Sequence, residues 1–411
     1  MTRHLFFLPD FQRLLFVGFS ASLVRWLETL AIALFAYRLT ESAFIVAMLS
    51  MLRVLPMGLF GALIGAAAER FGLRSALMLV AGTAMSTSLA LAVLASLGWL
   101  EVWQLAVANF INGICWASDN PVRRMMIGNV AGPERMGTAI SLDVASNNAS
   151  RVLGPMLAGA LLAQYAIASV FWLGALLLAL GFFAALRLRT GATASPAHAA
   201  SFISGFGEGF RWLRGDSRLL GVFMITVIFN VFGWPYTSLV PVIATDYFHL
   251  SPDGAGLLAG CEGIGGLVGA ILFAKLARAR WYGRIYVAAV AVYFATMIGF
   301  AAAPIAPAAA AILLLNGLVA VGFSVMQATL VYRLSPIEMR ARLLGVLSLC
   351  IGTGPVGFLY VGFLAEVLSP RGATVAVAAQ GLLALLLTRR WWRLLLRPKA
   401  GPAQQLVKTA A

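Results

Sequence analysis

Residues 43–74 read AFIVAMLSMLRVLPMGLFGALIGAAAERFGLR, and this stretch decides the fold class. Its part from 43 to 68 contains a single charged residue, Arg53, and exceeds the about 20 residues that a transmembrane helix needs. Arg70 and Arg74 follow directly. An apolar run that ends in arginines predicts a helix that crosses a membrane with its arginine-rich end in the cytoplasm.

The same pattern recurs along the chain. Of the 30 basic residues, 25 lie in every second gap between apolar runs, and only Arg38 and Arg371 lie in the other gaps. This alternation predicts a multi-pass protein with both termini in the cytoplasm. The twelve runs expected to span the membrane are 14–37, 43–68, 75–98, 102–127, 138–163, 167–187, 218–246, 253–275, 283–303, 308–332, 342–365 and 372–389.

Composition excludes a soluble fold. Apolar residues make up 61% of the 411 residues and charged residues 11%, against about 45–50% and about 25% in ordinary soluble domains. The net charge of +15 is dispersed over many short gaps, so we interpret it as membrane topology and expect no nucleic-acid partner. Only three of the 30 basic residues are lysines, which favours a GC-rich bacterial genome and hence the bacterial inner membrane.

The chain divides near its middle. Residues 188–217 begin with a Gly/Ala/Ser/Thr/Pro-rich stretch and continue with a possible interfacial helix at 207–214. The two sides also resemble each other at a constant offset, since Gly65 recurs as Gly269 and Gly159 as Gly362. We therefore expect an all-α membrane protein with a six-helix bundle at 1–187, a cytoplasmic linker at 188–217, a second six-helix bundle at 218–397 and a cytoplasmic tail at 398–411.

Three arginines lie near the middle of apolar runs, where a charge is unfavourable and is usually functional. Arg25 has Glu28 three residues further on, so the two are expected to neutralise each other on one helix face. Arg53 has no partner on its own span and is the residue expected to contact substrate directly. The third, Arg151, follows Asp143 and Asn147 at intervals of four. This spacing predicts a polar stripe that faces a cavity or the bundle interior.

Glu262 is the acidic residue near the centre of a second-half span, and glycines flank it. A carboxylate with so little cover and no obvious partner suits a group that binds and releases a proton. A structural hydrogen bond between helices is the alternative. A purely structural ion network is likewise the alternative for the first-half charges.

The end of the quoted stretch, GAAAERFGLR at 65–74, resembles the loop motif Gly-x-x-x-Asp-Arg-x-Gly-Arg-Arg/Lys of the major facilitator superfamily. Here Glu69 stands for the aspartate and Leu73 for one of the basic pair. In that superfamily the loop helps to latch the cytoplasmic side; an ordinary positive-inside loop is the alternative. The resemblance implies a gate made of Gly65, Glu69, Arg70, Gly72 and Arg74, with Arg123 or Arg124 as the partner of Glu69.

Residues 150–159, SRVLGPMLAG, are similar to the Gly-x-x-x-Gly-Pro-x-x-Gly-Gly signature of antiporters in the same superfamily. Pro155 removes one helix hydrogen bond and should bend the span, and Gly154 and Gly159 let a neighbouring helix approach. The intramembrane arginine that such antiporters carry in the fourth span is replaced by Asn109. Arg25 or Arg53 would then supply that charge.

A looser resemblance to siderophore and macrolide exporters rests on residues 8–15, 37–43 and 208–214. It implies a monomeric secondary transporter, with no enzymatic activity and no cofactor, that exports a small siderophore or drug-like molecule by proton antiport. Three mid-span arginines favour an anionic or polar substrate. Import by proton symport and a non-transporting receptor are the alternatives. The residues expected to bind substrate or couple protons are Arg25, Glu28, Arg53, Asp143, Asn147, Arg151 and Glu262.

Overall fold

The computed structural model describes residues 5, 7–189, 212–213, 215–336 and 339–396, without the side chains of 61–71 and 341. The described residues form helices and no strands. The first-half helices are α2 (Pro9–Thr40), α3 (Ala43–Phe71), α4 (Leu73–Ser96), α5 (Val102–Ala131), α6 (Met136–Gln164) and α7 (Ala168–Leu186). Those of the second half are α9 (Ser217–Ile228), η1 (Phe229–Gly233), η2 (Trp234–Leu239), α10 (Val240–Asp246), α11 (Pro252–Leu276), η3 (Ala279–Trp281), α12 (Tyr282–Ala302), α13 (Ala306–Leu334), α14 (Arg340–Ile351), α15 (Gly354–Leu368), α16 (Pro370–Leu387), α17 (Arg389–Trp392) and η5 (Arg393–Leu396).

Within the described residues, ten helical segments are long and apolar enough to cross a membrane. They correspond to ten of the twelve expected spans, and the prediction of a multi-pass helical membrane protein is confirmed. The two expected spans outside this set are α5 and α6, which are 30 and 29 residues long. Both carry several charged and amide side chains that lower their hydropathy.

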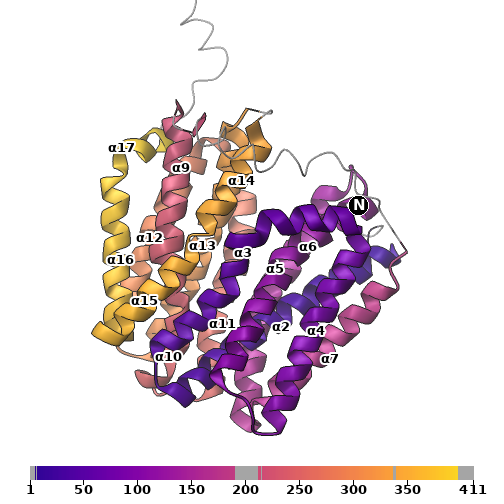
Figure 1. Ribbon diagram of the computed structural model, residues 1–411. Coiled ribbons are helices and arrows are strands. Elements are labelled where there is room, and N and C mark those ends of the chain that lie inside the picture. The colour runs from indigo at the N-terminus through magenta and orange to yellow at the C-terminus, as the bar shows by residue number, and fades with distance from the viewer. Residues whose placement is uncertain (1–4, 6, 190–211, 214, 337–338, 397–411) are drawn as a thin grey trace, which may run out of the picture.

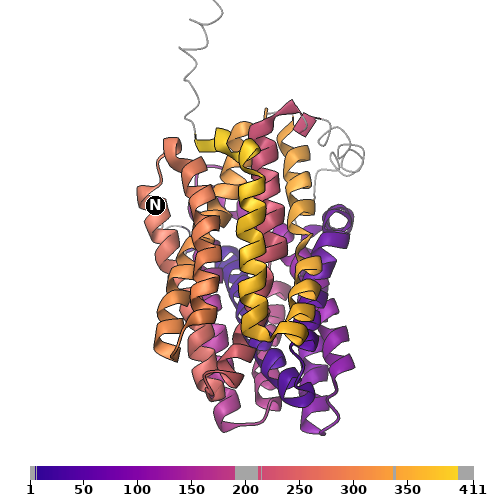
Figure 2. The same cartoon turned by 90° about the vertical axis from the view of Figure 1, so that its left-hand side faces the viewer.

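The two sequence halves lie side by side, α2–α7 on the right of Figure 1 and α9–α17 on the left. The main contacts between the halves are those of α6 with α11 and of α3 with α15. The beginning of α2 and the short α17 lie at the same end of the molecule, which also holds the turns around Gly72, Gly132 and Ala277 (Figures 1 and 2). We call this the arginine-rich end, and the end with the turns at 41–42, 247–251 and 369 the arginine-poor end.

Two segments of the second half are interrupted near the middle of the bundle. The helix that begins as α9 passes through a π-helical turn, η1, and a 3-10 segment, η2, before it continues as α10. The segment at 340–368 breaks between α14 and α15 at Gly352 and Thr353. These breaks were not expected from the sequence. The two breaks lie next to each other. The first turn of α15 packs so closely on η1 that a Cβ added at Gly357 would meet the carbonyl oxygen of Val231.

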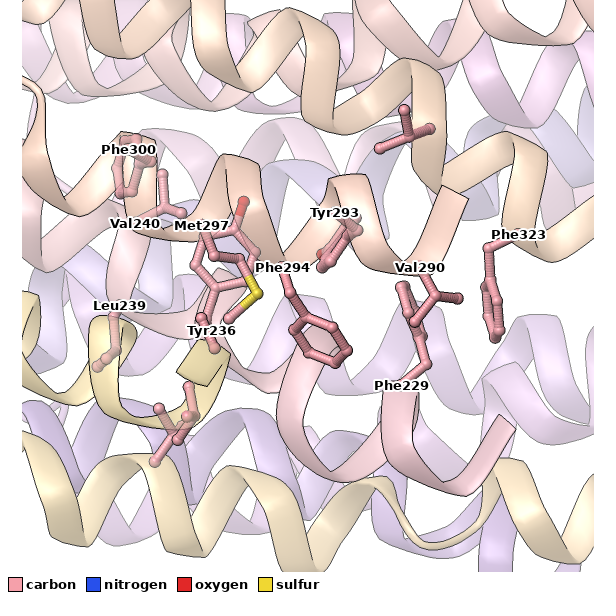
Figure 3. Packing of buried hydrophobic residues seen from close by; sticks show 14 of the residues in the cluster. Phe229, Tyr236, Leu239, Val240, Val290, Tyr293, Phe294, Met297, Phe300 and Phe323 are labelled. Atoms are coloured by element: carbon pink, nitrogen blue, oxygen red, sulfur yellow. The ribbon is translucent and has the colours of Figure 1, made fainter. Parts of the chain in front are cut away.

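The core of the second half is aromatic (Figure 3). The rings of Phe229 and Phe323 stack with their centroids 3.8 Å apart, and the ring of Tyr293 lies 4.7 Å from that of Phe229. Tyr236 is fully buried and packs edge-on against Tyr293 and Phe300. Neutral groups of this kind fill the interior where the first half places charges.

The predicted interfacial helix at 207–214 falls mostly outside the described residues, and the predicted tail at 398–411 lies wholly outside them.

Candidate functional site

A cavity of about 130 Å³ lies between the two halves, and we call it the central cavity. Both halves contribute charged and aromatic side chains to its wall. The charged ones are Arg25, Arg53, Arg151 and Glu262, and the aromatic ones are Trp26, Trp116, Trp234 and Phe358. Most of the remaining lining is aliphatic. Such a mixture accommodates a molecule that has both an apolar body and a polar or charged group.

Arg53, which has no partner on its own span, is paired with a residue of the neighbouring helix. Its Nη2 lies 3.6 Å from Oε2 of Glu28, and its Nη1 donates to the hydroxyl of Thr29 at 2.5 Å and to the carbonyl of Arg25 at 3.2 Å. The side chains of Arg53 and Glu28 are 8% and 2% exposed, so this is a buried ion pair between α3 and α2. The predicted pairing of Glu28 with Arg25 is wrong, because neutralisation comes from the neighbouring helix.

Arg25 is consequently the mid-span arginine without a carboxylate partner among the described residues. Its Nη2 donates to the hydroxyl of Ser22 at 3.1 Å. Its guanidinium lies over the ring of Trp116 at 4.9 Å from the centroid and near the ring of Trp26 at 5.8 Å. Indole rings attract a cation without neutralising its charge. Arg25 therefore brings to the wall of the central cavity a cation that no described carboxylate contacts directly, with Asp119 acting on it from across the first-half interior.

Arg151 and Glu262 form an ion pair across the two halves. Nη2 of Arg151 on α6 lies 2.5 Å from Oε1 of Glu262 on α11, and both side chains are partly exposed to the cavity. The expectation that Glu262 lacks a partner is therefore wrong. The pair meets where the backbones pack closely, since a Cβ at Gly263 would come within 2.8 Å of the carbonyl oxygen of Arg151.

Asp143 belongs to a separate cluster nearer the arginine-rich end. Its carboxylate pairs with Arg123 and, at 3.3 Å, with Arg124, while Nε of Arg123 also lies 3.1 Å from Asp119. Arg123 is 1% exposed, so two carboxylates and two guanidinium groups balance one another in the first-half interior. Both arginines thus contact acids of the first-half interior, while the partner that the family resemblance implied, Glu69, has its side chain outside the described part of the structure.

The remaining predicted gate residues are placed only in part. The side chains of Gly65, Glu69 and Arg70 lie outside the described part of the structure. Gly72 ends α3 with φ at 82°, a conformation that glycine adopts without strain. Arg74 donates from Nη2 to the carbonyl of Leu186 at 2.7 Å.

The predicted polar stripe of α6 points inward. Between Asp143 and Arg151, Asn147 donates to the hydroxyl of Ser22 on α2 at 3.1 Å. Further along, α6 runs through Pro155 as one helix, and Pro155 lines the central cavity. Its two glycines lie against different helices. A Cβ at Gly154 would lie 2.6 Å from that of Trp26 on α2, and one at Gly159 would lie 2.5 Å from the carbonyl oxygen of Pro252 on α11.

A second cavity, of about 60 Å³, lies inside the first half, and we call it the first-half cavity. It shares Arg25, Arg53 and Trp116 with the central cavity and is also lined by Glu28 and Asp119. No sequence pattern indicated this cavity, because its lining residues come from five helices, α2, α3, α4, α5 and α7. Its other polar lining residues are Ser20, Ser22, Asn112 and Cys115.

At the arginine-poor end, acidic side chains of the second half accept hydrogen bonds from the first half. Glu366 accepts hydrogen bonds from the hydroxyl of Ser42 at 2.5 Å and from the backbone N–H of Phe44 at 3.1 Å, at the beginning of α3. Asp246 accepts a hydrogen bond from the hydroxyl of Tyr37. The two halves are thus bridged beyond the central cavity at this end.

Helices that enclose a charged cavity between two similar halves define a solute transporter of the major facilitator superfamily. Within that superfamily, the chain belongs to the family described as transmembrane secretion effectors, whose model matches residues 8–400. This is a family of transporters and not of enzymes. Among the described residues, no cluster of three or more His, Cys, Asp or Glu side chains is arranged to hold a metal ion.

The curated relatives are distant. The chain is 29% identical over 156 residues to an uncharacterized MFS-type transporter of Bacillus subtilis, covering 38% of this chain and 36% of the relative. It is 24% identical over 247 residues to the macrolide efflux protein A of Streptococcus pyogenes, covering 59% and 60%. It is 22% identical over 279 residues to the staphyloferrin A transporter of Staphylococcus aureus, covering 67% of each. The chain thus spans only about a third to two thirds of the length of these relatives.

Solved structures match over nearly the whole chain. The nucleoside transporter NupG superposes with a TM-score of 0.76 at 13% identity, covering 93% of this chain and 99% of that one. A D-xylose-proton symporter superposes with a TM-score of 0.71 at 15% identity, covering 94% and 96%. These likenesses establish the transporter fold.

Proposed function

We propose that this protein exports a small, amphipathic, anionic organic molecule across the bacterial inner membrane in exchange for protons. The observation that carries the proposal is Arg25, which contacts no carboxylate among the described residues, on a cavity wall whose other charges are paired and whose remaining lining is mostly aromatic and aliphatic. A fixed cation in a low-dielectric cavity favours a carboxylate or another oxyanion. Relatives named as a siderophore transporter and a macrolide efflux protein support a substrate of this size and an outward direction.

The topology that belongs to this proposal has twelve spans in two six-helix bundles. Helices α5 and α6 supply the two spans beyond the ten apolar ones, because their length suffices and their polar groups face the interior or a cavity. The distribution of basic residues puts the arginine-rich end and both termini in the cytoplasm. The bridged arginine-poor end is then the outer side, and the cavity opens toward the cytoplasm when substrate enters.

Proton coupling is assigned to the ion pair between the halves. A proton on Glu262 removes the attraction that holds Arg151 to it, so α6 and α11 lose one contact across the central cavity. Alternating access requires the two halves to move relative to each other at this point. Protonation and substrate binding would both act on the arginines of the same cavity, so the two events are coupled through Arg151.

The substrate class can be tested with a matched pair of probes, a carboxylate-bearing siderophore and its methyl ester. With purified protein, Arg25→Gln should lower the affinity for the carboxylate by about tenfold or more and leave that for the ester nearly unchanged. Arg38→Gln, which changes an arginine outside the cavity, is the control. Equal loss for both probes would reject an anion site at Arg25.

The direction of coupling can be tested in proteoliposomes. Under exchange, an imposed proton gradient should drive the carboxylate siderophore into the compartment from which protons leave, and the probe should cause proton movement in the opposite sense. Movement of probe and protons in the same direction would establish symport and overturn the exporter assignment. The variant Glu262→Gln should lose gradient-driven accumulation while it retains exchange of substrate for substrate.

A further inference from the structure

We propose that Glu28 is a second proton-binding residue and that the hydroxyl of Ser88 is built to serve both its protonated and its ionised form. The inference rests on the proton-driven transport proposed above and adds a proton site inside the first half. Glu28 is 1% exposed and Ser88 is fully buried, so neither depends on bulk water for its hydrogen bonds.

In the observed arrangement, Glu28 accepts from all of its polar neighbours. The hydroxyl of Ser88 donates to Oε1 at 2.7 Å, and Nδ2 of Asn112 donates to Oε2 at 3.2 Å. The guanidinium of Arg53 lies 3.6 Å from Oε2, beyond hydrogen-bond distance. An ionised carboxylate can only accept hydrogen bonds, so this arrangement fits the ionised form.

Ser88 has a second acceptor within reach. Its hydroxyl oxygen lies 3.3 Å from the backbone carbonyl oxygen of Phe171 on α7. If Glu28 binds a proton at Oε1, the carboxylic acid can donate to the hydroxyl oxygen, and the hydroxyl can turn to donate to Phe171. Both states are then satisfied without moving a helix, and only two hydrogen positions change.

Gly174 on α7 leaves the space in which Ser88 and Glu28 meet. A Cβ at Gly174 would lie 2.7 Å from the hydroxyl oxygen of Ser88 and 3.2 Å from Oε1 of Glu28. A larger residue on α7 would therefore push the hydroxyl and the carboxylate apart. The absence of a side chain at Gly174 allows α2, α4 and α7 to bring the three groups together.

Protons can reach Glu28 through the first-half cavity. Glu28 lines the first-half cavity, whose volume of about 60 Å³ is enough for a few water molecules and whose mainly apolar wall carries several polar side chains that can bind them. Asp119 on α5 lines the same cavity. The charged or titratable groups around it are Arg25 on α2, Arg53 on α3, and Cys115 and Asp119 on α5. The described side chains of α7 add none.

A proton on Glu28 has a consequence at the central cavity. Arg53 would lose its carboxylate partner, while its Nε already has no hydrogen-bond partner among the described residues. The freed guanidinium lines the central cavity as well. Protonation of Glu28 is therefore transmitted to the substrate site through one side chain.

Infrared difference spectroscopy of the purified protein in lipid nanodiscs tests the proposal by equilibrium proton binding. Acidification should produce a protonated-carboxyl band that is absent in Glu28→Gln. Ser88→Ala removes a donor that stabilises the ionised form more than the neutral one, so its band should appear at a pH higher by about one unit. Ser86→Ala, an exposed serine on the same helix, should titrate like the wild type.

The outcomes separate this inference from the proposed function. An unchanged band in Glu28→Gln, or a Ser88→Ala titration identical to that of Ser86→Ala, would overturn the proton site. Because Ser88→Ala keeps the acid in place, it tests the site even if Glu28→Gln does not fold. If the band behaves as expected while proteoliposomes show no proton-coupled transport, the proton site stands and the exporter assignment fails.

Discussion

The two halves share a helical plan but fill their interiors in different ways. The first half buries acids and arginines that pair across helices, such as Glu28 with Arg53 and Asp143 with Arg123. The second half buries stacked aromatic rings and neutral hydrogen bonds, such as that from Gln327 to Thr226. It contributes one carboxylate to the central cavity, Glu262. The contrast concentrates the buried charge in the first half and, apart from Glu262, leaves the second half with a neutral, tightly packed interior.

The largest effect is expected from breaking the buried charge cluster. Arg123→Leu leaves Asp119 and Asp143 with one exposed arginine between them, and an uncompensated buried charge destabilises by about 3–5 kcal/mol. Thermal unfolding in detergent should show this loss. The control is Arg124→Leu, whose side chain is 46% exposed and which should change stability by about 1 kcal/mol or less. Equal stabilities for the two variants would contradict the view that this cluster is structural.

A comparable but charge-independent loss is expected in the second half. Phe323→Ala removes the ring that stacks on Phe229 and should destabilise the protein by about 3 kcal/mol. Its unfolding should have the same pH dependence as that of the wild type, because no ion pair is broken and Tyr286, which also stacks on Phe323, keeps the hydrogen bonds of its hydroxyl to Thr226 and Val222. If Phe323→Ala altered the pH dependence of stability, the division of roles between the halves would be wrong.

The smallest effect concerns the contacts across the halves at the arginine-poor end. Glu366→Gln combined with Asp246→Asn weakens exposed hydrogen bonds worth about 1 kcal/mol together, so the outward-open population should rise by about fivefold. Distances between spin labels at positions 39 and 367, on a background with Cys115, Cys261 and Cys350 replaced by serine, measure this shift. Glu101→Gln lies at the same end without bridging the halves and should leave the distances unchanged.

Sequence reasoning located the charges around the central cavity better than it identified their partners. Arg25, Arg53, Arg151 and Glu262 all line one cavity, as a mid-span charge predicts. The pairing of Arg25 with Glu28 was wrong because spacing on one helix says nothing about a competing group on the next helix. Arg53 is that group, and its pairing with Glu28 leaves Arg25 without a carboxylate contact among the described residues.

Other features had no sequence signal. Ser88 is one of many small residues on α4, and only the approach of Glu28 and of the Phe171 carbonyl gives its hydroxyl two acceptors. The breaks at η1, η2 and Gly352 occur in apolar stretches that resemble ordinary spans. A glycine that is required for close contact, such as Gly174, cannot be told from the other glycines of the chain until the facing atoms are known.

The sequence by itself determined the class of the molecule, because long apolar runs and the alternation of basic gaps are properties of one segment at a time. It also indicated that charges inside apolar runs, such as Glu28 and Arg53, would be enclosed, but it did not indicate the burial of Arg123, which it placed among the basic residues of the gaps. The tertiary structure alone decided which charges neutralise each other, which one faces the cavity, and where a hydroxyl can serve two acceptors. These outcomes depend on distances between helices, and contacts of a few ångströms between distant segments are set only when the bundle is packed.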